Sequence, residues 1–205
     1  MIANRRPDPR VAFDPDALGL RKTDRAFFRG NTVRVARGLL GAWIGRRWRG
    51  TWYGGRIVET EAYLGAGDRA AHSWAGRRTP RVEPMYRDGG HLYVFLVYGM
   101  HYCANVVTRK EGIAEAVLLR AAEGPEGAPA RLLSGPGRLC AALGLTTRDS
   151  GLDMLAPDAP VRLWRPARQR VGVRVSPRIG VDYAGAAKDW PLRFLDARSS
   201  AVSRG

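Results

Sequence analysis

The chain has 205 residues and is 45% hydrophobic, which suffices for one domain with a real core and would be cramped for two. Its formal net charge of +15 favours a polyanionic partner, nucleic acid before an anionic membrane surface or an acidic protein. Two cysteines without a Cys-x-x-Cys pair argue against a disulfide framework, and three histidines without partners at metal spacing argue against a zinc site. We therefore expect no metal and no cofactor.

The two chain ends are predicted to lie outside the folded part. Residues 1–16 are rich in Arg, Asp and Pro and are expected to form a mobile tail, and 198–205 a C-terminal tail, which leaves 17–197 as the domain. No signal peptide is recognisable, and the most apolar stretch, 92–107, is interrupted by Tyr-Gly-Met-His. These features predict a cytoplasmic protein without a membrane span.

Short apolar runs bounded by Gly, Pro and Asn predict more strands than helices. Helices are expected over 16–28, 32–40 (capped by Asn31) and 136–143, with a helical turn within 66–75 and loops over 76–90 and 122–135. Strands are expected over 42–48, 53–61, 91–98, 101–108, 116–121, 161–164, 171–175 and 192–195. Because this order lacks regular βαβ units, it indicates an α+β fold: a single domain with a largely antiparallel sheet.

Two glutamates are the first candidates for chemistry. Glu59 and Glu61 are two residues apart on a predicted strand, so both point to one face, and Tyr63 continues that face. A glutamate beside an aromatic ring in a half-enclosed pocket can act as a general base. The alternative is a solvated strand face with two inert glutamates. His72, taken alone, is more typical of a structural histidine than of a catalytic one.

An Arg-rich loop follows the glutamates. Arg69, Arg77, Arg78 and Arg81 fall within thirteen residues that contain no acid, and Thr79 lies inside the run. Such a loop suits contacts to phosphates. The alternative is an ordinary solvated basic loop.

The predicted hairpin around Gly99 carries several aromatic residues. Tyr93, Phe95, Tyr98 and Tyr102 would be core in most proteins, but Tyr98, Met100 and His101 fall at the tip, where exposed apolar surface needs a use. A wedge inserted between base pairs is one such use. Asn105, in the returning strand, needs hydrogen-bond partners if it is buried, and the edge of a base would supply one.

The chain resembles the alkyladenine (3-methyladenine) DNA glycosylase family, of the mammalian methylpurine type, in the segments RIVETEAYLG, AAHS, RRTPR, LYVFLVYGMHYCANV, VLLRA, SGPGRLCAALG and PLRF. The resemblance covers about residues 17–197. It implies a mixed domain around a curved, largely antiparallel sheet, with peripheral helices and a protruding hairpin that enters the DNA minor groove. It also implies excision of damaged purines from double-stranded DNA in base-excision repair.

The resemblance assigns roles to the residues that match the family's motifs. Glu61 would be the general base that activates water, Arg120 would also hold this water, and a backbone carbonyl near Ile179 would help. The flipped base would lie between Tyr63, His72 and Phe95, and Asn105 would disfavour the 2-amino group of guanine. Tyr98 would fill the gap in the duplex. The DNA surface would include Arg77, Arg78, Thr79, Arg81, Met100 and His101.

Two departures leave the substrate range open. Phe95 stands where the family often has tyrosine, which keeps the stacking surface and loses a hydroxyl, and His101 replaces an expected aromatic residue. The resemblance implies 3-methyladenine and 7-methylguanine as substrates, and hypoxanthine and ethenoadenine stay open as further candidates.

Other classes of protein fit the sequence less well. A nucleobase deaminase requires His-x-Glu and Pro-Cys-x-x-Cys motifs, and neither is present. A binding module that had lost its chemistry would not need both Glu61 and Arg120. The only lysines, Lys22, Lys110 and Lys188, lie outside the motif block, so we expect no Schiff base and no lyase step. We expect a monomer, associated with the nucleoid of a bacterial cell.

Overall fold

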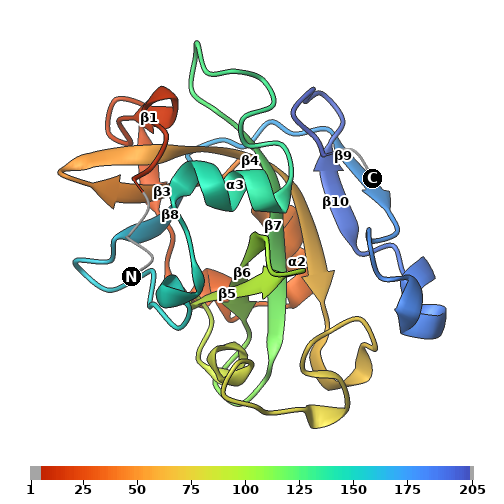
Figure 1. Ribbon diagram of the computed structural model, residues 1–205. Coiled ribbons are helices and arrows are strands. Elements are labelled where there is room, and N and C mark those ends of the chain that lie inside the picture. Colours follow the sequence, from red (N-terminus) through yellow and green to blue (C-terminus); the bar gives the residue numbers. More distant parts are fainter. Residues whose placement is uncertain (1–5, 204–205) are drawn as a thin grey trace.

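The computed structural model describes residues 6–203, and its central feature is a ten-stranded antiparallel sheet (Figure 1). The main path of the sheet runs β2-β8-β3-β4-β7-β6-β5, with β1 and β10 paired to β4, and β9 paired to β10. The strands are β1 Ala12–Phe13, β2 Leu20–Lys22, β3 Trp43–Trp48, β4 Thr51–Tyr63, β5 Leu92–Val97, β6 His101–Thr108, β7 Glu115–Glu123, β8 Val161–Pro166, β9 Val173–Ser176 and β10 Arg193–Asp196. The predicted α+β class with a largely antiparallel sheet is confirmed.

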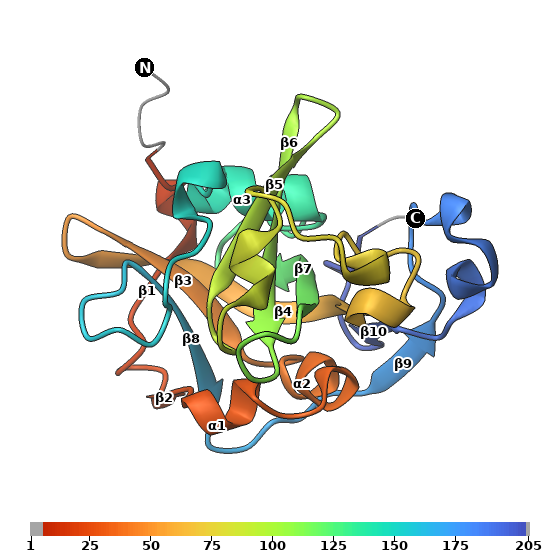
Figure 2. The same cartoon turned by 90° about the horizontal axis from the view of Figure 1, so that it is seen from below.

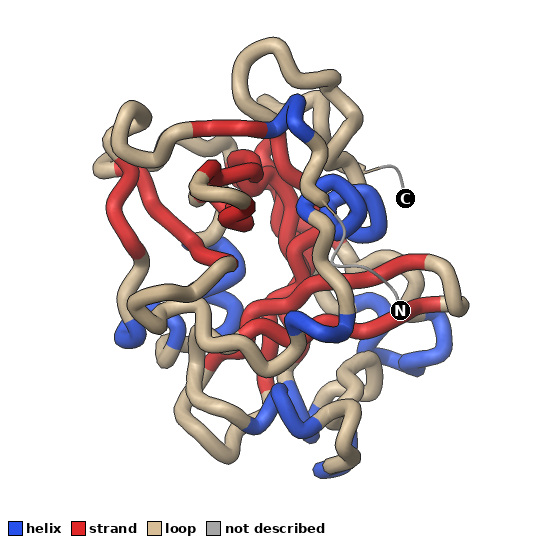
Figure 3. Tube along the Cα trace, turned by 60° about the vertical axis from the view of Figure 1, so that its left-hand side comes forward, coloured by secondary structure: helices blue, strands red, loops and turns tan. Residues whose placement is uncertain are grey.

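Helices are few and short, and Figure 3 shows long loops between the helices and strands. They are α1 Arg25–Phe28, α2 Thr32–Gly38 and α3 Pro136–Leu143, with 3₁₀ turns at Pro9–Val11, Gly65–Gly67, Trp74–Gly76, Glu83–Tyr86, Thr147–Asp149 and Asp182–Asp189. Within residues 6–203 no helix is long and apolar enough to cross a bilayer.

The helix at Asn31 forms for the reason that the sequence indicates. The Asn31 side chain accepts hydrogen bonds from the backbone N–H groups of Val33 and Arg34, at 3.1 and 3.2 Å, which satisfies two donors of the first turn of α2. Val35 and Ala36 of α2 are buried and pack into the main core between the helix and the sheet. This element is confirmed, although it ends two residues earlier than expected.

The helix predicted over 16–28 is mostly wrong. Residues 20–22 form β2, which pairs with β8, and only Arg25–Phe28 is helical. Asp24 accepts a hydrogen bond from the N–H of Phe27 at 2.8 Å and so starts the helix late. Gly19, at φ +60°, ends the preceding turn. Local capping chemistry therefore outweighs the helical pattern of apolar residues.

Both chain ends are more ordered than expected in the part that the structure describes. Val11 is fully buried, and Ala12 and Phe13 pair with Tyr53 and Trp52 of β4. Within residues 6–16, Val11 therefore belongs to the core and residues 12–13 to the sheet, whereas residues 1–5 lie outside the described range. At the other end, residues 201 and 203 are buried behind β4 and β7.

Strand β4 is the longest and places the chemistry. It pairs with β3 along its first half and with β7 along its second, and Gly54 permits the close approach because a Cβ there would lie 1.9 Å from the Ile44 carbonyl oxygen. Register shifts on either side of Glu59 mark a bulge between β4 and β7. Bulges re-aim side chains next to functional sites.

The β5–β6 hairpin projects from the body of the molecule (Figure 2). Val97 pairs with His101, so the turn contains three residues, Tyr98-Gly99-Met100, rather than the two expected. Tyr98 has φ +50°, which is unfavourable for a residue with a Cβ and is typical of strained functional positions. Its side chain is 87% exposed.

Candidate active site

A cavity of about 440 Å³ opens at the base of the hairpin. Its walls come from β4, β5, β6 and β7, from residues 179–181, and from Tyr183 near the start of the last 3₁₀ turn. They include the predicted site residues Tyr63, His72, Arg81, Phe95, Tyr98, Asn105, Arg120 and Ile179. The fold therefore brings together residues that are up to 116 positions apart in the sequence, and most of the walls are apolar.

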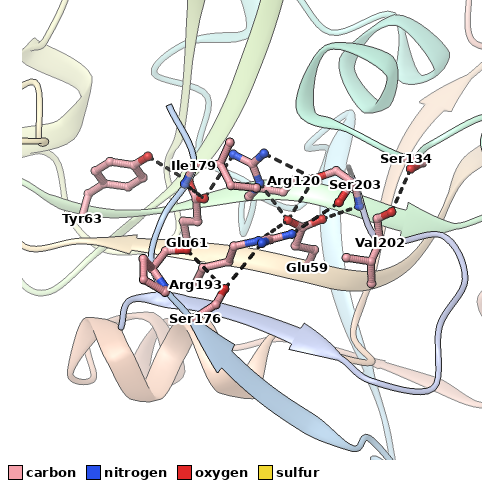
Figure 4. Close-up of polar contacts among 11 residues, drawn as sticks. Glu59, Glu61, Tyr63, Arg120, Ser134, Ser176, Ile179, Arg193, Val202 and Ser203 are labelled. Carbon is pink, nitrogen blue, oxygen red and sulfur yellow. Dashed lines mark hydrogen bonds and ion pairs between the residues drawn. The ribbon is translucent and has the colours of Figure 1, made fainter. Parts of the chain in front are cut away.

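Glu61 lies directly behind this wall and its side chain is fully buried. Its Oε2 accepts a hydrogen bond from the Tyr63 hydroxyl at 2.9 Å, and its Oε1 accepts one from the Ile179 N–H at 2.8 Å. Arg120 Nη1 lies 3.2 Å from the same Oε1 (Figure 4). Two hydrogen bonds and one ion pair therefore hold this buried carboxylate in place.

Arg120 lies between two carboxylates. Its Nε donates to Glu59 Oε1 at 2.9 Å while Nη1 faces Glu61. Burial disfavours the charged guanidinium, but the charges of Glu61 and Glu59 outweigh that penalty and raise the pKa of Arg120. Arg120 lies at the bulge between β4 and β7, where Glu59 pairs with Ala121 and Thr60 pairs with Leu119.

Tyr63 is held on both sides. Burial, together with the charge of Glu61, raises the pKa of its hydroxyl well above the usual value of 10, so the hydroxyl remains a donor to Glu61. The Arg178 guanidinium lies 4.7 Å from the centre of the Tyr63 ring. Arg178 in turn donates to Asp68 Oδ1 at 2.9 Å, and the side chains of both residues are fully buried.

The opposite wall is aromatic. His72 meets Phe95 edge to face at a centroid distance of 4.4 Å, and its Nδ1 lies 2.8 Å from the Tyr93 hydroxyl. Burial raises the pKa of Tyr93 to about 12, so this hydroxyl stays protonated. Asn105 is anchored because its Nδ2 donates to the Tyr93 carbonyl at 3.1 Å.

The comparison with known families settles what kind of protein this is. The family profile described as Methylpurine-DNA glycosylase (MPG) matches residues 26–200, most of the chain.

The chain belongs to the methylpurine-DNA glycosylase family.

Related bacterial proteins agree with this assignment. A provisionally named 3-methyladenine DNA glycosylase of Desulfitobacterium hafniense is 41% identical over 203 residues, covering 90% of this chain and 99% of the relative. One of Bacillus thuringiensis is 38% identical over 200 residues, covering 87% and 97%, and one of Bdellovibrio bacteriovorus is 42% identical over 176 residues, covering 82% and 91%. The protein is thus a DNA glycosylase of base-excision repair, a hydrolase of N-glycosyl bonds.

The residues of the Arg-rich loop of this glycosylase differ in their exposure and in their contacts. Arg77 and Thr79 are exposed, as a DNA-contacting role requires. Arg78 instead forms an exposed two-pronged pair with Glu83, at 2.7 and 2.8 Å, and Arg81 lies over the Phe95 ring at 5.6 Å. Arg81 therefore belongs to the cavity wall as much as to the outer surface.

The three predicted DNA-contacting residues of the hairpin tip differ in how freely they are exposed. Tyr98 and Met100 are 87% and 71% exposed. His101 is also exposed, but its ring lies close to Gly137 of α3, where a Cβ would come within 3.2 Å of it. Tyr98 and Met100 are therefore the freer of the three to enter a duplex.

Sequence reasoning missed three contacts of the site. At Ile179 the group that meets Glu61 is the N–H, whereas a carbonyl was expected to act there. The buried Arg178–Asp68 pair and the approach of Ser203 to Glu59 were not foreseen. The arginine beside Ile179 in the RIGV segment was the only local signal for the pair, and Ser203 gave none.

His72 is expected to titrate far below an ordinary histidine. Burial, and then the charges of Arg81 and Arg77, lowers its pKa to about 4. The pKa of an unfolded histidine is about 6.5, so the unfolded chain binds the proton more readily than the folded one. The neutral His72 ring therefore stabilises the folded state above pH 6.5, and this stabilisation is lost as the pH falls from 6.5 through 4. Imidazole resonances followed by NMR should show a midpoint near 4. A midpoint near 6.5 would contradict the buried position of the ring.

Proposed function

We propose that the protein removes 3-methyladenine and 7-methylguanine from double-stranded DNA by hydrolysing the N-glycosidic bond with an activated water, which leaves an abasic site. The observation that carries the proposal is the buried pair of Arg120, in the wall of an aromatic cavity of about 440 Å³, and Glu61, directly behind that wall. That volume lies within the usual range for small-molecule sites. Hypoxanthine and ethenoadenine are further candidate substrates.

The damaged nucleotide reaches the cavity by leaving the duplex. Extrusion costs a few kcal/mol, and less for a base whose pairing is already weakened, so the step itself favours damage. Tyr98 is the proposed wedge because it is exposed at the tip of the projecting hairpin and directly adjoins the cavity. Its strained backbone fixes the ring outward before DNA binds.

Replacing Tyr98 by alanine should weaken activity through base extrusion rather than through chemistry. Base–aromatic stacking contributes about 1–3 kcal/mol per base, so Tyr98→Ala should lower kcat/KM by roughly 5- to 150-fold. The loss should shrink when the damaged base is placed in single-stranded DNA, which offers no gap to fill. Equal losses on duplex and single strand, measured side by side, would contradict the wedge role.

Glu61 and Arg120 share the chemical step in this proposal. Glu61 takes a proton from the water that attacks C1′, and its negative charge stabilises the oxocarbenium-like sugar as the base departs. Arg120 keeps the carboxylate oriented and offers a donor to the same water. Purines methylated at N3 or N7 are cationic and leave readily, whereas neutral purines need protonation.

The reaction is proposed to stop at the abasic site. A lyase step needs an amine nucleophile, and the three lysines of the chain are absent from the cavity wall. Borohydride added during turnover should therefore trap no covalent protein–DNA adduct. An adduct seen on a denaturing gel would overturn this part of the proposal.

The surroundings of the site suit a protein that acts as a monomer on nucleoid DNA in a bacterial cytoplasm. The net charge of +15 implies many phosphate contacts, so affinity for duplex DNA should fall steeply with salt. The exposed hairpin faces the duplex in this arrangement and needs no partner subunit.

The proposal is tested by incubating the protein at low salt with methylated duplex DNA and, separately, with a duplex that carries one hypoxanthine. Free purines and alkali-labile sites are then counted. Release of methylpurines with an equal number of alkali-labile sites is the expected result, and the second duplex defines the range. Tight binding of both duplexes without release would show a binding module that has lost its chemistry.

A further inference from the structure

Residues 201–203, here called the C-terminal segment, lie at the back of the active site. Ala201 is 1% exposed and packs with Val58 and Ala121 of β4 and β7. Ser134 Oγ also donates to the Val202 carbonyl, at 3.3 Å (Figure 4). Ser203, 9% exposed, then lies against Glu59.

Glu59 is a fully buried carboxylate that receives four hydrogen bonds. The Ser203 N–H donates to its Oε2 at 2.7 Å, and the Ser203 hydroxyl donates to its Oε1 at 3.0 Å. The other two donors, both to Oε1, are Arg120 Nε at 2.9 Å and Arg193 Nε at 2.7 Å. Ser203 thus supplies half of the donors that hold Glu59 in place.

Charge explains what Glu59 does for the site. The cluster contains two carboxylates, Glu59 and Glu61, and two guanidinium groups, Arg120 and Arg193, so it is balanced. Glu59 accepts from Nε of Arg120, and the Ser203 hydroxyl accepts from Nη2 at 3.3 Å, so Nη1 is the nitrogen directed at Glu61. Without the charge of Glu59, the cluster would hold two guanidinium groups and one carboxylate, and Nε of Arg120 would lose its acceptor.

Resting on the proposed function, we propose that Glu59 and Ser203 are positioning residues: the C-terminal segment fixes Glu59, and Glu59 orients Arg120 so that one nitrogen serves Glu61 and the attacking water. Neither residue lines the cavity, so neither touches the base. Supporting groups of this kind hold a catalytic side chain within the narrow range that the reaction needs.

The test is a double-mutant cycle on single-turnover base release, with Glu59→Gln, Ser203→Ala and Arg120→Met made singly and in pairs. Misplacing a reacting group costs on the order of 100-fold, so Glu59→Gln should slow release by roughly 10- to 100-fold and Ser203→Ala by several-fold, with the affinity for damaged duplex within about twofold. In the Arg120→Met background both changes should have almost no further effect, because they act through Arg120.

Ser134→Ala is the matched control, since it removes one contact to the same segment and none to Glu59. Its rate should stay within about twofold of wild type. Rates for Glu59→Gln and Ser203→Ala that equal wild type, or losses that add fully to that of Arg120→Met, would overturn the inference. If Glu59→Gln does not fold, Ser203→Ala carries the same comparison. A wild-type protein that releases no base would instead refute the proposed function, and the two failures are therefore distinct.

Discussion

Replacing Glu61 by glutamine is expected to slow purine release by about 10²–10⁴-fold, the usual contribution of a general base. The amide keeps the size of the side chain and an oxygen that can still accept from the Ile179 N–H. It cannot take the proton of the attacking water, and it carries no charge to stabilise the sugar cation. The measurement is the single-turnover rate on duplex DNA that contains one methylated purine.

Two controls separate chemistry from binding and folding. The affinity of Glu61→Gln for the damaged duplex should stay within a few-fold of wild type, because the wedge and the aromatic walls are unchanged. Glu123→Gln affects a carboxylate at the end of the same strand as Arg120, where it is paired with Arg56 and does not line the cavity. Its rate should match wild type. A Glu61→Gln rate close to wild type would remove Glu61 from the mechanism.

Replacing Asp68 by alanine is expected to lower the free energy of unfolding by about 3–5 kcal/mol, as for other buried ion pairs that lose one partner. Asp68 and Arg178 have fully buried side chains, so the substitution leaves a guanidinium without its counter-charge. Arg178 also donates to the carbonyls of Ala62 and Ala187, at 3.0 and 3.1 Å. A displaced Arg178 would therefore also weaken the hydrogen bonding at the end of β4. Denaturant unfolding, followed by fluorescence, measures the loss.

A second substitution distinguishes the charge from the packing. Asp68→Ala combined with Arg178→Met should recover much of the stability, because an apolar replacement of both partners leaves no buried charge. Glu83→Ala, which breaks the exposed pair with Arg78, should leave the unfolding midpoint nearly unchanged. If Asp68→Ala were as mild as Glu83→Ala, the Asp68–Arg178 pair would not be a structural support of the site.

Local sequence predicted the parts of the site that depend on alternation along one strand. Glu61 and Tyr63 were expected on one face of a strand, and the structure joins them by a hydrogen bond of 2.9 Å. The hairpin and its exposed Tyr98 also followed from local pattern. These features depend on a period of two residues and on turn chemistry, both of which are readable within a few positions.

The remaining features depend on contacts between distant parts of the chain. Pairing of Ala12 with Tyr53 orders a segment whose composition suggests a tail. The bulge beside Glu59 arises from a mismatch between two strands that are about sixty residues apart, and no local pattern marks it. Glu59 is a candidate in the sequence only because it alternates with Glu61, and its contacts with Arg120, Arg193 and Ser203 depend on the fold. Register and tertiary pairing override local propensity at all of these places.

The central claim is that this cavity receives a purine flipped out of duplex DNA, with its glycosidic bond beside Glu61. The most direct measurement is a crystal structure of Glu61→Gln bound to a duplex with one 2′-fluoro-7-methylguanine, in which the fluorine stabilises the glycosidic bond. We predict the purine between Tyr63, His72 and Phe95, its C1′ facing residue 61, and the Tyr98 ring in the vacated place. A methylated base still stacked in the duplex, with Tyr98 outside it, would contradict the account.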